Sequence, residues 1–186
     1  EEPQEGIVRV SGYLPTTDLS LWQPLIGLFQ RSESTAKASW VPVFDLHLDQ
    51  MDLASLQLQD IQGIASLRDG ILDLNFVTDL ADGQLLMATA DAQQVPVLNL
   101  TRLMVPEALL EKSVSESTID PRQFIALDFS VDRLQIADKE WGSIGFKLRP
   151  EISGAAFSDI RGNLLGLQPG LFDNQPATEF FWGFDG

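Results

Sequence analysis

Residues 127–132 read Leu-Asp-Phe-Ser-Val-Asp, so apolar and polar side chains alternate with a period of two. Residues 45–49 (Asp-Leu-His-Leu-Asp) and 71–78 (Ile-Leu-Asp-Leu-Asn-Phe-Val-Thr) follow the same pattern. Successive side chains of a β-strand point to opposite faces, so this alternation is typical of strands with one apolar and one wet face. The sequence therefore predicts a mainly β protein.

Glycines between these segments mark the expected turns, and consecutive strands should form antiparallel meanders. The turn positions are Gly70, Asp82-Gly83, Gly142, Gly154 and Gly162. The expected strands cover 39–53, 55–68, 70–79, 84–91 and 94–100, and then 124–137, 140–149, 151–158, 163–168 and 177–184.

Two short helices are expected between the strand groups. Trp22, Leu25, Ile26 and Phe29 recur with helical spacing after a cap at Thr17 or Asp18. The second helix is expected over residues 106–112.

The strand groups repeat along the chain. Leu46, Leu48, Asp49, Met51 and Leu53 return 83 residues later as Phe129, Val131, Asp132, Leu134 and Ile136. Residues 66–68 match residues 147–149 at an offset of 81. We therefore divide the chain into three parts: the end of a preceding repeat with a helical crossover (1–38), a repeat with its crossover (39–123) and a following repeat (124–186).

Repeated units of this kind bury their apolar faces by stacking, which favours an extended sheet or solenoid. The competing architecture is a closed sandwich or barrel formed by duplication. The chain opens Glu-Glu-Pro without a Met, and we expect it to be one continuous piece of a larger protein.

Composition excludes some partners. The chain has 186 residues, with 12 Lys and Arg against 27 Asp and Glu, a formal net charge of −15. Phosphate binding needs a basic surface, so no nucleic-acid partner is expected. The chain has no cysteine, which excludes disulfides and thiolate metal sites.

No catalytic motif is present, and the sequence predicts neither an enzyme nor a cofactor. Residues 142–145 lack the spacing of a nucleophile elbow, and His47 is the sole histidine. Asp45, His47 and Asp49 share one strand face and could in principle hold a metal. The second copy has Asp128, Ser130 and Asp132 at these positions, so we interpret the set as a solvated face and expect no metal site.

The apolar alternation has two interpretations: a packed core, or a sheet curled into a trough that contacts acyl chains. In the trough interpretation the carboxylates of Asp45, Asp49, Asp73, Asp128 and Asp132 face water, because burying one unpaired would cost several kcal/mol. The residues expected to line the concave side are Phe44, Leu46, Leu48, Leu72, Leu74, Phe76, Phe129, Val131, Phe146 and Leu148.

Several short blocks carry a resemblance to a known family. Gly-Tyr-Leu-Pro at 12–15 and the segment 18–26 (Asp-Leu-Ser-Leu-Trp-Gln-Pro-Leu-Ile) are similar to the strand-to-helix segment of the YhdP-type AsmA-like family. Val97 to Leu103, the block Asp-Pro-Arg at 120–122 with its continuation to Asp128, and the closing Phe-Trp-Gly-Phe-Asp-Gly at 181–186 resemble later parts of the same repeat. Ile125 departs from the family, which often has Pro there.

The resemblance implies an elongated, curled antiparallel sheet of repeating β-groove units, each with about five strands and a crossover. It also implies a function: a periplasm-spanning, inner-membrane-anchored lipid-transfer bridge of a Gram-negative bacterium that carries phospholipid between the inner and outer membranes. The implied partners are phospholipid acyl chains, neighbouring repeats of the same chain, and membranes reached through segments outside these residues.

A second class of function remains open: a non-enzymatic envelope scaffold or interaction module with a closed β core. Two sealed layers would favour that scaffold, whereas an open apolar channel would favour transport. In the repeat architecture of the lipid-transfer bridge, residues 177–184 should form an unpaired sheet edge, because internal repeats expose their end strands when their neighbours are absent.

Overall fold

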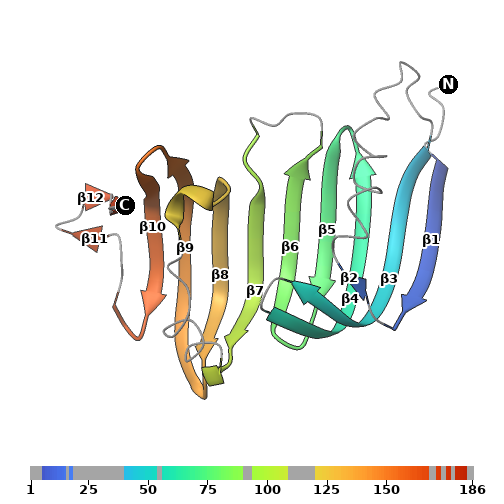
Figure 1. The fold of residues 1–186 in the computed structure, drawn as a ribbon, viewed down its shortest axis with the longest axis horizontal. Coiled ribbons are helices and arrows are strands. Elements are labelled where there is room, and N and C mark those ends of the chain that lie inside the picture. Colours follow the sequence, from blue (N-terminus) through green and yellow to red (C-terminus); the bar gives the residue numbers. More distant parts are fainter. Residues whose placement is uncertain are drawn as a thin grey trace. The chain divides into compact units, whose positions relative to one another are not determined.

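The computed structural model describes residues 6–15, 17–18, 40–53, 56–89, 94–108, 120–167, 171–172, 175–176 and 179–183. Over these ranges the fold is mainly β, and its sheets are open and curled rather than closed into a barrel (Figure 1). The fold class predicted from the sequence is thus confirmed. The chain forms two compact units, Glu1–Gln94 and Val95–Gly186, here called unit 1 and unit 2.

Unit 1 is a sheet with the strand order β1, β3, β4, β5, β6. The strands are β1 (Gly6–Leu14), β3 (Trp40–Leu53), β4 (Leu56–Arg68), β5 (Ile71–Val77) and β6 (Ala81–Ala88), with the short β2 (Thr17–Asp18) paired to β3.

Unit 2 is a sheet with the order β7, β8, β9, β10, β13. The strands are β7 (Val97–Val105), β8 (Leu127–Ile136), β9 (Lys139–Glu151), β10 (Gly154–Leu164) and β13 (Phe180–Gly183). A 3₁₀ turn, η2 (Pro121–Gln123), precedes β8, and β11 (Leu171–Phe172) and β12 (Gln175–Pro176) form a separate two-stranded ribbon.

Pairing direction follows the length of the connection. Strands joined by short turns pair antiparallel, as expected. The pairs β1–β3 and β7–β8 are parallel, because a crossover returns the chain in its original direction. The antiparallel pattern therefore holds within each meander and changes at the crossover.

Three of the predicted turn glycines lie inside strands instead. Gly142 falls within β9, Gly83 within β6 and Gly162 within β10. The β5–β6 turn comes earlier, at Thr78, whose hydroxyl accepts from the backbone N–H groups of Leu80 and Ala81. The Gly70 turn has the predicted form, with positive φ at both Asp69 (51°) and Gly70 (74°), the geometry of a tight two-residue hairpin. The β9–β10 turn also lies beside its predicted glycine, at residues 152–153 directly before Gly154.

The predicted separate strand 163–168 is wrong. β10 continues to Leu164 because Gly162 supports an extended strand rather than a turn. Gly162 has a φ of +144°, and a Cβ there would lie 2.1 Å from the Ser143 carbonyl oxygen. Because glycine has no Cβ, it lets the backbone of β10 approach the backbone of β9 this closely.

The two predicted helices fall largely on residues that the structure leaves undescribed. The amphipathic helix around Trp22–Phe29 lies wholly outside the described residues. In the predicted second helix over 106–112, Glu107 and Ala108 are helical, and residues 109–112 lie outside the described ranges.

The central pairing of β3, β4 and β5 in unit 1 repeats in β8, β9 and β10 of unit 2 with one offset, up to the register shifts in the strands of unit 2. In unit 1, Phe44 lies opposite Ala65 and Ala65 opposite Leu74. In unit 2, Leu127 lies opposite Leu148 and Leu148 opposite Phe157. All three positions differ by 83, so the offset of 81 predicted for residues 66–68 is wrong by two residues. A slip of two preserves which face a side chain occupies.

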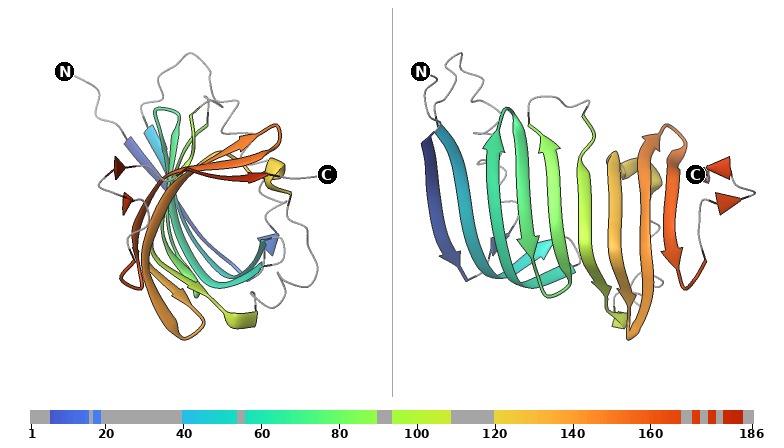
Figure 2. Two further views of the ribbon diagram at one scale, coloured as in Figure 1. Left: turned by 90° about the vertical axis from the view of Figure 1, so that its left-hand side faces the viewer. Right: turned by 180° about the vertical axis from the view of Figure 1, so that it is seen from behind.

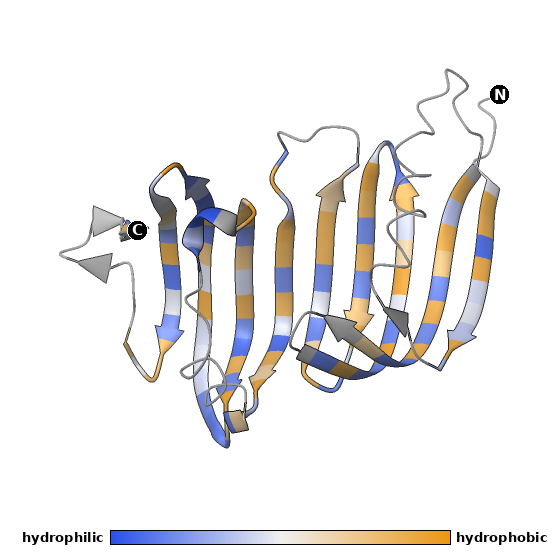
Figure 3. Cartoon of the chain, in the orientation of Figure 1, coloured by the Kyte–Doolittle hydropathy of each residue, from blue (hydrophilic) through white to orange (hydrophobic). Residues whose placement is uncertain are grey.

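The strands of each unit curl toward one side (Figure 2), and polar and apolar bands alternate along them (Figure 3). Burial differs between the two faces of a strand: Ile61 is 5% exposed, whereas Ile64 on the same strand is 46% exposed. Side chains on the inside of a curl converge and shield one another, while those outside diverge. The face that carries Ile61 is therefore the concave one.

Candidate functional site

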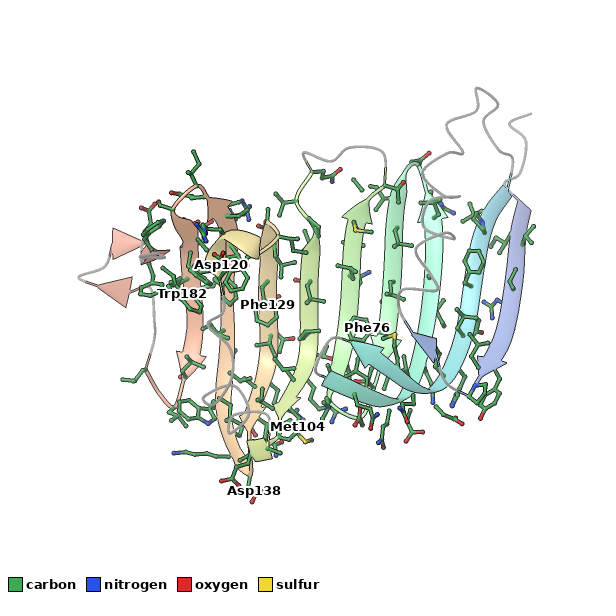
Figure 4. All side chains as sticks on the ribbon, viewed as in Figure 1. Phe76, Met104, Asp120, Phe129, Asp138 and Trp182 are labelled. Atoms are coloured by element: carbon green, nitrogen blue, oxygen red, sulfur yellow. The ribbon has the colours of Figure 1, made fainter. Side chains whose placement is uncertain are left out.

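The concave face of unit 1 is apolar across four strands. The predicted residues Phe44, Leu46 and Leu48 of β3 share one face of the sheet. The pairing of β3 with β4, and of β4 with β5, relates this face to β5. The predicted residues Leu72, Leu74 and Phe76 occupy that same face on β5, and β6 adds Met87 opposite Leu72 and Leu85 opposite Leu74. Phe76 is marked in Figure 4.

The concave face of unit 2 is also apolar, and it is richer in aromatic rings. Phe129 lies opposite Phe146, and Val131 opposite Ile144. Leu148, the last of the predicted set, lies opposite Phe157 of β10. Val131 is 2% exposed and is among the most buried side chains described.

A continuous row of four rings crosses unit 2, one from each of β8, β9, β10 and β13. The rings are those of Phe129, Phe146, Phe157 and Phe180, here called the aromatic row. Figure 4 labels Phe129, the first of them. Successive ring centroids are 5.0, 5.5 and 5.8 Å apart, within the range of favourable aromatic pairs.

One rim of this face is covered by η2. The turn is capped by Asp120, whose Oδ1 accepts from the Arg122 backbone N–H at 3.0 Å and whose carboxylate also binds the Arg122 guanidinium (Nη2 to Oδ2, 2.7 Å). Arg122 thereby lowers the pKa of Asp120, chiefly through this side-chain hydrogen bond. Pro121 is fully buried, and the ring of Phe124 meets Trp182 edge-on at 5.8 Å.

The opposite face of unit 1 is mixed. It carries the predicted carboxylates, and it also carries a surface pocket whose apolar lining includes Ile7, Val41, Val43, Ile71 and Leu86. Asp45 pairs with Arg9 at 3.5 Å. Asp73 Oδ1 accepts from the side chain of Gln84 at 2.8 Å. Asp49 accepts a hydrogen bond from the hydroxyl of Tyr13, which raises the pKa of Tyr13.

Unit 2 has a matching polar face. Asp128 binds Arg149 at 2.6 Å, and Asp132 is exposed. Lys147 binds Asp159 and lowers its pKa, first through the hydrogen bond and then through its charge. Ion pairs on this face separate it chemically from the apolar concave side.

The structure assembles no metal centre from Asp45, His47 and Asp49. His47 Nε2 lies 3.8 Å from Asp49 Oδ1, and its ring packs against Tyr13. In the described part of the chain, no group of three or more His, Cys, Asp or Glu residues is arranged to hold a metal ion. Over the same residues, no helix has the length and apolar character to cross a membrane.

Comparison of the chain with protein-family models, curated proteins and solved structures gave no match. The site must therefore be interpreted from its own geometry.

Sequence reasoning missed part of the concave face. Phe157 was available from the repeat, because it matches Leu74 at the offset of 83. Ile61 and Leu100 are each 5% exposed. Ile61 follows Asp60, where the alternation of β4 changes phase, whereas Leu100 lies in an alternating stretch with Leu98 and could have been included. Phe124 contributes to this face through its ring contact with Trp182, and no local sequence pattern predicts that tertiary contact.

β13 lies at the end of the strand order of unit 2, as predicted for residues 177–184. Its side chains are exposed: Phe180 by 55%, Phe181 by 48% and Trp182 by 38%. Phe180 and Trp182 face the concave side, and Phe181 faces the other.

Proposed function

We propose that this chain is a segment of a lipid-transfer protein whose concave apolar faces hold phospholipid acyl chains while the headgroups stay in water. The observation that carries the proposal is the apolar character of the central part of the concave face in both units. Each methylene removed from water contributes about 0.8 kcal/mol. Because this attraction has no direction, a chain can slide along such a face without a dedicated polar site.

The wider setting follows from the resemblance to the YhdP-type AsmA-like family. In that setting the chain is part of an inner-membrane-anchored bridge that crosses the periplasm and carries phospholipid between the inner and outer membranes. Neighbouring repeats of the same chain would continue the apolar face, and the proposal includes no catalytic step.

The scaffold alternative requires a second layer packed on the apolar face. Among the described residues the sheet of each unit is open on that side, which favours the conduit. A closed β core would bury the rings of Phe180 and Trp182, whereas both are exposed.

Charged substitutions on the concave face should separate transport from folding. Leu74 and Phe129 are partly exposed, so an aspartate at either position keeps contact with water but interrupts the apolar surface. For Leu74→Asp and Phe129→Asp we expect binding of a fluorescent phospholipid to weaken at least about tenfold, with a folded protein by circular dichroism and loss of complementation in cells.

The matched controls are Asn75→Asp and Ser130→Asp, one residue along each strand and on the polar face. Both should bind lipid as the wild type does. A collapse of the melting temperature in Leu74→Asp and Phe129→Asp alike would show a dry core and defeat the proposal, as would unchanged lipid binding.

A further inference from the structure

The aromatic row of unit 2 lies among apolar side chains. Beside the row the register places Leu98, Leu100, Leu127, Val131, Ile144, Leu148, Pro150, Ala155 and Trp182. All of them are apolar, and Phe129, Phe146 and Phe157 keep part of their surface exposed. A ligand on this row meets rings and aliphatic groups alone.

The row has a built boundary at one rim. Trp182 lies opposite Ala155, which is fully buried, and two residues beyond Phe180 on β13. Phe124 packs on Trp182, and η2 holds Phe124 in place through its buried Pro121 and the Asp120 cap. The Phe124–Trp182 pair therefore closes one side of the row.

The ring geometry selects the shape of the ligand. Neighbouring rings are inclined by 33°, 61° and 53°, so they share no plane on which a flat polycyclic molecule could stack. An unbranched hydrocarbon chain bends at each bond and can follow such a row. Without charged groups beside the row, the headgroup has to lie elsewhere.

We propose that the aromatic row, bounded by Phe124 and Trp182, is a discrete site that binds one acyl chain of a lipid. The proposal rests on the proposed function and deepens it, because it assigns a preferred binding position in unit 2 rather than equal binding along the whole concave face. An acyl chain on the row contacts several rings in succession and lies beside the indole of Trp182.

Trp182 provides the test. In the full chain with Trp22→Phe, Trp40→Phe and Trp141→Phe, Trp182 is the single tryptophan. Vesicles of phosphatidylcholine brominated along the acyl chains should quench its fluorescence, whereas unbrominated vesicles should not. Moving the indole one position, with Phe181→Trp and Trp182→Phe, puts it on the opposite face, where quenching should be lost.

Two variants test the residues of the row. Phe157→Ala, checked for an unchanged fold by circular dichroism, should weaken lipid binding about tenfold. Ile125→Ala is the control, because Ile125 is 69% exposed beside the same rim, and it should bind as the wild type does.

The outcomes distinguish this inference from the proposed function. If native mass spectrometry detects bound phospholipid but Trp182 is not quenched, or Phe157→Ala binds normally, the acyl chain rests elsewhere and only the inference fails. If the wild type binds no phospholipid at all, both fail.

Discussion

We expect Val131→Asp to unfold unit 2. Val131 is 2% exposed and lies between Leu100 and Ile144 of the neighbouring strands. An ionised carboxylate buried there without a partner costs several kcal/mol, comparable with the whole stability of a typical domain. Urea denaturation followed by circular dichroism, with hydrogen exchange to locate the change, would measure the loss.

Ser130→Asp is the control for this substitution. Ser130 is the preceding residue, and its hydroxyl binds the Asn99 side chain on the polar face. The same added charge there should change the unfolding free energy by less than about 1 kcal/mol. Equal stability of Val131→Asp and the wild type would contradict the assigned register of β8.

Gly162→Ala should be the second severe substitution. The new Cβ would lie 2.1 Å from the Ser143 carbonyl oxygen and 2.8 Å from the Ile144 Cα, at a φ of +144° that side chains rarely adopt. Either the β9–β10 ladder separates locally or the backbone strains, and we expect a loss of about 3 kcal/mol of unfolding free energy.

Gly63→Ala is the matched control for the glycine test. Its Cβ would make an ordinary contact at 3.6 Å with Leu74 Cδ1, so its unfolding free energy should stay within about 1 kcal/mol of the wild type. Denaturant midpoints at constant slope would compare the two. If Gly162→Ala were as stable as Gly63→Ala, β10 would not be continuous through residue 162.

The face of each strand was predictable because it depends on parity alone. Leu74 and Asp73 are separated by one position, and no slip by an even number of residues exchanges them. For this reason the residues predicted together fall on one face of their unit's sheet, although residues 66–68 were matched at 81 rather than 83. Exact pairing was not predictable, since alternation looks the same after a slip of two.

Glycine roles were harder to predict. Gly70 makes a turn and Gly162 permits close approach of two strands, yet each stands beside an alternating segment. What distinguishes them is the backbone across the ladder, which a single sequence does not contain. The η2 turn could have been predicted, because Asp120 followed by Pro121 is a cap with proline at the first position.

The two units use different chemistry on the same scaffold. At the positions related by the offset of 83, unit 1 places Leu46 and Leu74 where unit 2 places Phe129 and Phe157. The reverse exchange occurs at Phe44 of unit 1, which matches Leu127 of unit 2, so the aromatic rings are distributed differently over the two faces.

The central claim is that acyl chains occupy the concave faces, and photo-crosslinking tests it most directly. A phospholipid with a diazirine in its acyl chain would be loaded onto the intact chain, irradiated, and mapped by peptide mass spectrometry. The account predicts adducts on concave residues such as Leu46, Leu74 and Phe129. Adducts confined to polar-face positions such as Ser130 or Asn75, or no adduct above a competition control, would contradict it.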